Sequence, residues 1–266
     1  MNNFDASDIQ AKMQQQKVCV VMPTYNNSGT LRDVVERVLI YCADVIVVND
    51  GCTDNSAEIL ASFGERVTVV DYGRNRGKGY ALKQGFKKAK AMGFDYVLTI
   101  DSDGQHFPED IPLFVEALLT AGHDPLTRKG NSNVLIVGSR NLNQENMPGG
   151  NTFANKFSNF WFKVQTGVHL PDTQTGYRLY PLQKLPHIFS ARYEAELSLL
   201  VFSAWRGINL VPIKVNVCYP EDRVTHFRPF WDFFRISVLN TVLCLVAIVY
   251  GWPSRLIHKL LGRKNT

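Results

Sequence analysis

The sequence lacks the features of a secreted, disulfide-bonded protein and those of a structural zinc site. Its five cysteines are scattered, odd in number and without Cys-x-x-Cys spacing, which argues against disulfides and zinc and for a reducing compartment. Residues 1–17 are polar and Gln-rich and have no apolar run of the kind that signal peptides carry. No internal repeat and no low-complexity tract is present. We therefore expect a cytoplasmic location.

Two common nucleotide-binding fingerprints are also missing. No Gly-x-Gly-x-x-Gly follows the first apolar run, which argues against a dinucleotide-dependent dehydrogenase, and no Gly-Lys-Ser or Gly-Lys-Thr P-loop is present. Neither sign of charge dominates, since the net charge is only +5, and we expect no nucleic-acid partner. A hydrophobic content of 45% over 266 residues is enough for a folded core, so we expect flexibility only at the ends.

What the sequence does contain is an alternation of short apolar runs and helical patterns over its first two-thirds. The apolar runs lie at residues 18–22, 45–49, 67–71, 96–101 and 134–138. They are apolar on both faces, which is typical of parallel strands covered by helices on each side. Helical spacing of apolar residues follows Ser28 and again follows Pro108. These patterns predict an α/β fold with a mostly parallel sheet, whose ligands bind at the carboxyl ends of the strands.

The fourth apolar run ends on two aspartates. Asp101 and Asp103 are two residues apart, and in an extended chain such side chains point to the same side. Two carboxylates on one side favour a hard divalent cation, Mg²⁺ or Mn²⁺, that holds a diphosphate. The alternative interpretation is a solvated turn, because Asp, Ser and Gly are common turn residues. Polar residues also follow the other four runs, so we favour a shared ligand pocket.

Five motifs occur together at these strand ends. They are Pro-x-Tyr-Asn at residues 23–26, Asn-Asp-Gly-x-Thr-Asp at 49–54, Asn-x-Gly-Lys-Gly-x-Ala at 75–81, Asp-x-Asp-Gly-Gln-His at 101–106 and Gly-Ser-Arg at 138–140. With these motifs the sequence resembles the family 2 glycosyltransferases of the GT-A fold over residues 18–219. Within that family it resembles the branch of dolichol-phosphate-mannose synthases and other polyprenyl-phosphate glycosyltransferases.

The resemblance implies a site for a nucleotide-diphosphate sugar, either a GDP-sugar or a UDP-sugar. Asp101, Asp103 and Gln105 would hold the divalent cation and the diphosphate, with Asp103 the firmest metal ligand. His226, in a basic loop after a last predicted strand at residues 211–217, would be a further metal ligand, with a structural role as the alternative. The base, the ribose and the diphosphate of the donor would be contacted by Pro23, Tyr25, Asn27, Asp50 and Lys78.

The resemblance also implies an acceptor side. Arg178 would bind the acceptor phosphate, because its planar guanidinium can contact two phosphate oxygens at once. Arg140 is a second phosphate candidate, and Glu194 would lie near the acceptor. The alternatives are a solvated Arg178 in a turn and strand, a structural ion pair for Arg140, and a Glu194 that only favours a helix start. Glu194 and Glu196 are two apart on the predicted helix and cannot face the same way.

A long apolar run occupies residues 236–252, and aromatic residues flank it. Basic residues without an acid follow it, which fits the cytoplasmic face of a membrane. Its length is at the lower limit for a spanning helix, so we favour a helix that lies in the membrane interface or re-enters it over one that spans, with a buried core helix as the alternative. The predicted organisation is a flexible segment at 1–16, a GT-A domain at 17–220, and a basic loop with the apolar helix and its basic tail at 221–266.

Together these expectations describe an inverting glycosyltransferase. An acceptor phosphate, with a second pKa of about 6, is already an anion at neutral pH and needs no general base. A hydroxyl acceptor on a glycan or a lipid headgroup is the alternative, and it would need Asp172 or Glu194 as the base. A sugar-nucleotide-binding protein without turnover is a further alternative, which the intact carboxylates Asp101 and Asp103 argue against. We favour a lipid phosphate of the polyprenyl or dolichyl type as the acceptor.

Overall fold

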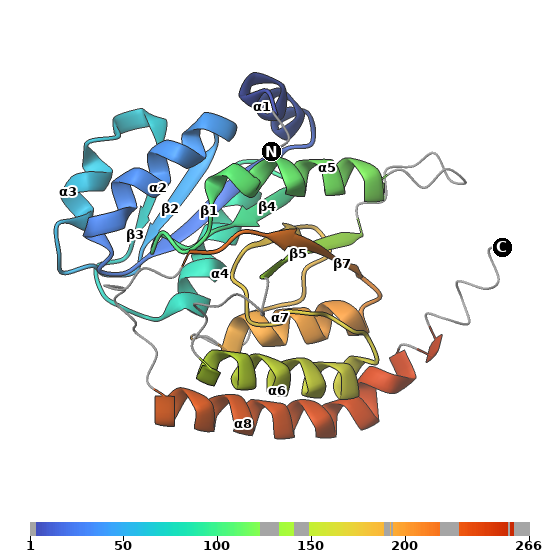
Figure 1. Ribbon diagram of the computed structural model, residues 1–266. Helices are drawn as coiled ribbons and strands as arrows, with labels where there is room; N and C mark the ends of the chain where they lie inside the picture. Colours follow the sequence, from blue (N-terminus) through green and yellow to red (C-terminus); the bar gives the residue numbers. More distant parts are fainter. Residues whose placement is uncertain are drawn as a thin grey trace.

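The computed structural model describes residues 4–122, 133–140, 149–188, 192, 194–218, 229–254 and 256–257. Across these residues seven strands form one sheet in the order β3-β2-β1-β4-β6-β5-β7. Helices cover both of its faces (Figure 1). The strands are β1 (Val18–Thr24), β2 (Val45–Asn49), β3 (Thr68–Asp71), β4 (Tyr96–Thr99), β5 (Val134–Arg140), β6 (Arg178–Pro181) and β7 (Asn209–Val215). This is the mostly parallel α/β sheet that the apolar runs predict.

The strand directions place several carboxyl ends at one edge of the sheet. β1 pairs in parallel with β2 and β4, and β2 pairs in parallel with β3. β6 is antiparallel to both β4 and β5, so β5 runs in the same direction as β4, and β7 is parallel to β5. The polar segments that follow these strands therefore gather at the same edge.

Alternate residues of the central strand β1 face two different cores. Val20 and Met22 pack in a cluster with α1, α2, α3 and α5 on one face of the sheet, whereas Cys19 and Val21 pack with α4, α6, α7 and α8 on the other. Burial on both faces is the reason that this run is apolar throughout. The helices are α1 (Ala6–Gln15), α2 (Ser28–Tyr41), α3 (Ser56–Ala61), α4 (Lys78–Ala91), α5 (Ile111–Gly122), α6 (Gly149–Thr166), α7 (Glu194–Trp205) and α8 (Pro229–Val246).

Residues 6–15 form the helix α1, which corrects the expectation of a flexible stretch for this part of residues 1–16. Asp5 caps α1 by accepting a hydrogen bond of 3.0 Å from the backbone N–H of Ser7. Ile9 and Met13 lie one turn apart and are both buried in the core that contains α2 and α5. Two apolar residues were too few to reveal this helix within a polar, Gln-rich segment.

α8 combines the two interpretations of the apolar run at residues 236–252. The helix continues through a π-helical turn at Ala247–Gly251, and Ser237–Ser254 is long and apolar enough to cross a membrane, although 22% of this window is buried in the protein. Asn240 and Leu243 are buried, and α8 contacts α6 and α7. Its other side is apolar and exposed, with Val249 81% exposed. One side of α8 therefore packs on the domain, and the other is an exposed apolar surface.

Specific contacts hold α8 to the domain. The side-chain amide of Gln165 in α6 donates to Asn240 Oδ1 at 3.1 Å, and the Ser254 hydroxyl donates to the backbone carbonyl of Trp205 at 2.9 Å. A Cβ added at Gly251 would clash with the indole of Trp205, so this crossing requires glycine. Figure 1 shows α8 as the outermost helix on this face, alongside α6.

Candidate active site

Lys78 lies at the centre of the predicted donor site. It is the first residue of α4, and its ammonium lies 2.8 and 2.9 Å from the two carboxylate oxygens of Asp101, beyond β4. Glu196 of α7 lies 3.0 Å from the same ammonium. Burial alone would lower the pKa of Lys78, but the charges of Asp101 and Glu196 outweigh burial and raise it. Lys78 is therefore charged and held between two carboxylates.

Asp101 and Asp103 both lie in the turn after β4. Because β4 ends at Thr99, the alternation of an extended strand does not orient them, and their side chains are half-buried rather than solvated. Burial and the charge of Asp101 raise the pKa of Asp103 to about 6, whereas Lys78 outweighs burial and lowers the pKa of Asp101. Gln105 donates to Asp103 from its backbone N–H at 3.0 Å and from its side-chain amide at 2.8 Å. Burial first, and then the charge of Asp101, disfavour the ionised form of Asp103, and a divalent cation bound there would stabilise that form.

Asp50 holds the loop that leads to Lys78. Its buried carboxylate accepts hydrogen bonds from the Tyr72 hydroxyl at 2.7 Å, the Asn75 amide at 3.0 Å, and the backbone N–H groups of Arg76 at 2.8 Å and Gly77 at 2.9 Å. These four donors come from one short segment between β3 and α4. The carboxylate is thus engaged within the protein, and its contact with a base and ribose stays a prediction.

Asn27 joins the end of β1 to the turn that carries the two aspartates. Its side-chain amide donates to the Ser102 hydroxyl at 2.9 Å, and that hydroxyl donates to the backbone carbonyl of Pro23 at 3.2 Å. Thr30 of α2 donates to the Ser102 carbonyl at 2.6 Å. Tyr25 is half-buried between Pro23 and Asn27 in the chain. The structure therefore brings these residues to the site, while their contacts with the nucleotide stay predictions.

Arg140 ends β5 and forms a two-point ion pair with Asp172. Its Nε lies 2.6 Å from Oδ2 and its Nη2 lies 3.0 Å from Oδ1 of the carboxylate. Asn155 of α6 donates to the same Oδ1 at 2.6 Å, and Asp172 is 0% exposed. Burial would raise the pKa of Asp172, but Arg140 lowers it. The structural ion pair expected as the alternative is present, and contact of Arg140 with an acceptor phosphate stays a prediction.

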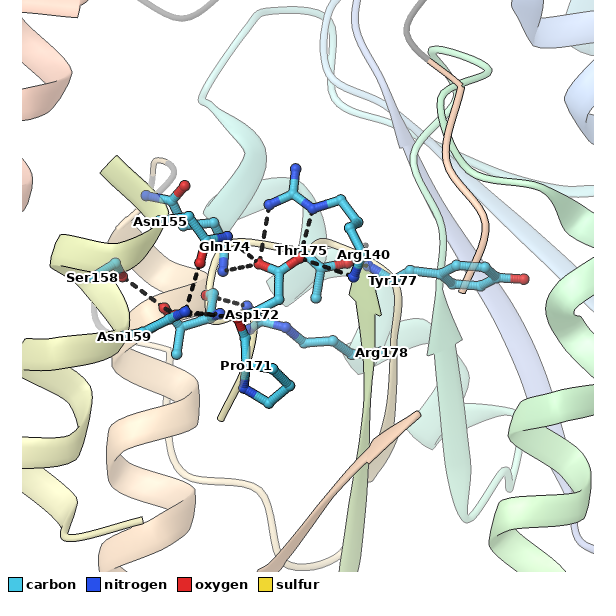
Figure 2. A network of polar contacts seen from close by, with 11 residues as sticks. Arg140, Asn155, Ser158, Asn159, Pro171, Asp172, Gln174, Thr175, Tyr177 and Arg178 are labelled. Carbon is cyan, nitrogen blue, oxygen red and sulfur yellow. Dashed lines mark hydrogen bonds and ion pairs between the residues drawn. The ribbon is translucent and has the colours of Figure 1, made fainter. Parts of the chain in front are cut away.

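The ion pair belongs to a wider polar network (Figure 2). Asn159 of α6 accepts from the backbone N–H of Thr173 at 3.0 Å and from its hydroxyl at 2.8 Å, and donates to Asn155 at 2.7 Å. The hydroxyls of Ser158 and Thr173 lie 2.7 Å apart. These contacts fasten the loop before β6 to α6, so α6 determines where Asp172, and with it Arg140, stands in the site.

Arg178 is buried within the domain and engaged by protein groups. It begins β6 and is 0% exposed. Its guanidinium donates to the backbone carbonyls of Glu196 at 2.7 Å and Thr173 at 2.9 Å, and to the Tyr180 hydroxyl at 3.1 Å. The alternative of a solvated Arg178 is therefore wrong, while its contact with an acceptor phosphate stays a prediction. Its planar fork joins α7 to the loop before β6.

Glu196 is the carboxylate of α7 that contacts Lys78 in the predicted sugar-donor site. The sequence did not identify it as a site residue. Glu194, which it favoured, is the first residue of α7 and is half-buried, and its contact with an acceptor stays a prediction. The spacing required the two side chains to face different ways but did not say which one faces the site. Because α7 is buried on nearly all sides, its apolar pattern has no single face that could have identified Glu196.

Two histidines complete the comparison with the sequence. His106 is buried beside Tyr177, with ring centroids 5.2 Å apart, and burial lowers its pKa to about 4, so the ring is neutral at pH 7. Its backbone forms an antiparallel bridge with Val217 beyond β7. His226 lies outside the described residues, and its role as a metal ligand stays a prediction.

Comparisons with known proteins identify the family of the chain. Residues 19–168 match the family model described as glycosyl transferase family 2. The chain is 31% identical over 257 residues to an undecaprenyl-phosphate 4-deoxy-4-formamido-L-arabinose transferase of Photorhabdus laumondii, over 92% of this chain and 71% of the relative. It is 25% identical over 232 residues to a UDP-N-acetylglucosamine–dolichyl-phosphate N-acetylglucosaminyltransferase of Methanococcus voltae, over 79% of this chain and 88% of the relative.

The fold is also found in solved structures. One is glucosyl-3-phosphoglycerate synthase from Mycobacterium tuberculosis in complex with Mn²⁺, UDP and glucosyl-3-phosphoglycerate, which matches with a TM-score of 0.62 and 20% identity over 93% of this chain and 85% of its own. At this identity the likeness shows the fold alone. The family model spans more than half of the chain and includes the strand ends that carry Asp50, Lys78, Asp101 and Asp103. The chain therefore belongs to glycosyl transferase family 2 and is a glycosyltransferase.

Proposed function

We propose that the protein transfers a sugar from a nucleotide-diphosphate sugar to a polyprenyl- or dolichyl-type lipid phosphate, with inversion at the anomeric carbon. The observation that carries this proposal is the cluster of Lys78, Asp101 and Asp103 at the carboxyl end of β4. The two relatives, whose names specify transfer involving dolichyl phosphate and undecaprenyl phosphate, support the choice of acceptor. The nucleotide, GDP or UDP, and the sugar are to be identified by assay.

A divalent cation, Mg²⁺ or Mn²⁺, fits this cluster by charge. In the part of the chain that the structure describes, no group of three or more His, Cys, Asp and Glu side chains could hold a metal ion without further ligands. Asp101 and Asp103 offer the anionic oxygens that such a cation prefers, and the donor diphosphate would supply others. When bound, the cation offsets charge on the departing diphosphate, and such electrostatic stabilisation is typically worth about 3 kcal/mol or more of barrier. Mn²⁺ and UDP in the M. tuberculosis structure support this choice.

The chain's own residues would orient the donor. Lys78 brings a positive charge to the diphosphate side, and Asp50 fixes the loop from which Lys78 projects. Asn27, through Ser102, keeps the turn with Asp101 against the end of β1. Each of these contacts is made before the donor binds, so little reorganisation is needed when it arrives.

The state of Asp172 favours a phosphate acceptor over a hydroxyl. A hydroxyl must lose its proton to a base whose pKa lies near the working pH. Arg140 lowers the pKa of Asp172, which makes this carboxylate a poorer base. A phosphate oxygen is already anionic and can attack the anomeric carbon directly, as the bond from that carbon to the diphosphate oxygen breaks. One such displacement inverts the anomeric centre.

The exposed side of α8 supports a peripheral position on the cytoplasmic face of a membrane. Large apolar residues that are more than about a third exposed mark a surface that favours lipid. On α8 and the turns that continue it they are Val238, Val242, Leu245, Ile248, Val249, Tyr250, Trp252, Leu256 and Ile257. Phe160 and Val164 of the neighbouring α6 are exposed as well. The buried side of α8 keeps the helix on the domain, which favours a helix lying in the interface over one that spans.

A donor panel tests the proposal. Purified protein with Mn²⁺ and a polyprenyl phosphate would be incubated with radiolabelled GDP- and UDP-sugars, and label in the organic phase would be counted after extraction. We expect one nucleotide class to give a lipid-linked product, and the anomeric configuration of that product to be opposite to that of the donor. Retention of configuration would contradict the single displacement. No lipid-linked product from any donor would contradict the proposed acceptor.

A further inference from the structure

The ammonium of Lys78 lies within 3.0 Å of three carboxylate oxygens. Two belong to Asp101, at 2.8 and 2.9 Å, and the third is Oε2 of Glu196, at 3.0 Å. The exposed fraction of the side chain is 17% for Lys78, 25% for Asp101 and 9% for Glu196. Both oxygens of Asp101 that a divalent cation would bind are thus already in contact with Lys78.

The second oxygen of Glu196 lies beside this cluster without a partner. Oε1 is buried and has no hydrogen bond among the residues that the structure describes. A buried carboxylate oxygen without a donor is unfavourable, so a Glu with a purely structural role would be expected to use both oxygens. A Cβ added at Gly176 would stand 3.2 Å from Oε1 and 2.7 Å from Nζ of Lys78, so the unpartnered oxygen is close to the ammonium.

We propose that Glu196 is a positioning residue that retains Lys78 when the divalent cation of the donor complex binds Asp101. The inference rests on the proposed function, because it assumes a cation and a diphosphate at Asp101. The ammonium leaves Asp101, stays on the carboxylate of Glu196, where Oε1 becomes an acceptor beside Oε2, and turns its remaining N–H groups to the diphosphate. The ammonium keeps anionic acceptors throughout. Without Glu196 it would stay on Asp101 and compete with the cation.

The loop before β6 restricts the movement of Lys78. A Cβ added at Gly176 would lie 2.7 Å from both Asp101 Oδ2 and Lys78 Nζ, so only glycine fits there without displacing them. The hydroxyl of Thr99 in β4 donates to the Gly176 carbonyl at 2.7 Å and fixes the loop in this place. With this side closed by backbone, Glu196 is the neighbouring anion to which the ammonium can turn.

The test compares Glu196→Gln with Glu116→Gln. Glu116 of α5 contacts Lys12 of α1 at 2.9 Å, and this Glu–Lys pair of similar length joins two helices away from the site. Binding of Mn²⁺ would be measured by titration calorimetry with and without UDP or GDP. We expect Glu196→Gln to weaken Mn²⁺ binding in the nucleotide complex at least about tenfold, the loss of one charge-assisted hydrogen bond. Glu116→Gln should change it less than about twofold.

A double-mutant cycle with Lys78→Met separates positioning from a simple effect of charge. If Glu196 acts through Lys78, Glu196→Gln will have little further effect in the Lys78→Met protein, because no ammonium is left to hold. Equal losses in both backgrounds would mean that Glu196 acts on the cation by its charge alone, and they would overturn the proposal. Unchanged binding in Glu196→Gln alone would overturn it as well.

Glu196→Asp is a second variant for the case in which Glu196→Gln does not fold. It keeps the charge but shortens the side chain, so we expect binding between that of the wild type and Glu196→Gln, and full wild-type affinity would contradict the proposal. Thermal unfolding of each variant would verify the fold. If the wild-type protein fails to bind Mn²⁺ both in the presence of UDP and in the presence of GDP, the proposed function and this inference are both refuted. If the wild type binds Mn²⁺ in the nucleotide complex and Glu196→Gln binds it with equal affinity, only the inference is refuted.

Discussion

The guanidinium of Arg140 donates two hydrogen bonds to the carboxylate of Asp172, from Nε to Oδ2 at 2.6 Å and from Nη2 to Oδ1 at 3.0 Å. This pair joins the end of β5 to the loop before β6. Breaking a buried pair by removing one charge typically costs about 3–5 kcal/mol. We therefore expect Asp172→Asn to lower the free energy of unfolding by about this amount, measured by urea denaturation. Asp33→Asn breaks the exposed pair with Arg37 and should leave stability nearly unchanged. Equal, small effects of the two variants would contradict the account.

The same pair predicts how stability depends on pH. The pKa of Asp172 is lower in the folded protein than in the unfolded chain, where an aspartate has a pKa of about 3.9. The unfolded chain therefore takes up this proton first as the pH falls. The contribution of Asp172 is complete above about pH 4 and is lost as the pH falls below that value. Between pH 5 and pH 3, the wild type should lose more stability than Asp172→Asn; parallel curves would contradict this.

Removing charge from the proposed cation site should stop turnover without unfolding the protein. We expect Asp103→Asn to lower kcat at least about a hundredfold, since it removes charge from the place where the leaving diphosphate must be neutralised. Thermal unfolding should show that the variant still folds, because burial and Asp101 raise the pKa of Asp103 and make its charge unfavourable in the fold. Excess EDTA should abolish the wild-type reaction, and full activity in EDTA would falsify the requirement for a divalent cation.

Gly51 and Gly64 provide a matched test of the loop that Asp50 holds. Both have positive φ, +70° and +56°, but a Cβ at Gly51 would clash with the backbone of Arg74 and Asn75, whereas a Cβ at Gly64 would meet nothing within 4 Å. Gly64→Ala should cost only the backbone strain, about 1–2 kcal/mol. Gly51→Ala should cost more and raise the KM for the donor, because it displaces the loop that leads to Lys78. An equal KM for the two variants would argue against this role of the loop.

The apolar side of α8 should govern binding to lipid. The double variant Leu245→Ser and Val249→Ser removes two exposed apolar side chains, and we expect it to reduce co-flotation with anionic vesicles strongly. Ile40→Ser is the control, because Ile40 is 50% exposed on α2, which covers the other face of the sheet. Loss of flotation in the control, or its persistence in the double variant, would place the lipid-binding surface elsewhere.

The sequence predicted the parts of the fold in which a regular pattern of apolar residues reflects which side chains are buried. Residues 18–22 of β1 are all apolar because Val20 and Val21 face opposite cores, and such runs predicted the parallel strands. β6 was not among them, because it begins with Arg178, and a buried arginine has the same sequence pattern as a solvated one. Its burial depends on carbonyl acceptors from α7 and a loop, which only the tertiary structure brings together.

The sequence predicted which residues of the donor side lie together better than it predicted their neighbours on α7. Lys78 and Asp101 lie in motifs at strand ends, and strand direction alone brings them to one edge of the sheet. The partner of Lys78 on α7 could not be chosen in the same way, since Glu196 and Glu194 are both acidic and the helix is buried nearly all round. α1 was difficult to predict for the opposite reason, because too few of its residues are buried. Only Ile9 and Met13 of this helix are buried, within a polar segment.

The central claim is that the acceptor is a lipid phosphate. It is tested most directly by supplying the protein, Mn²⁺ and the donor identified by the panel with two matched acceptors, a polyprenyl phosphate and the polyprenol of the same chain length. The two lipids differ only in the phosphate, so label recovered in the organic phase reports that group alone. We predict transfer to the polyprenyl phosphate and none to the polyprenol. Transfer to the polyprenol at a comparable rate would contradict the claim.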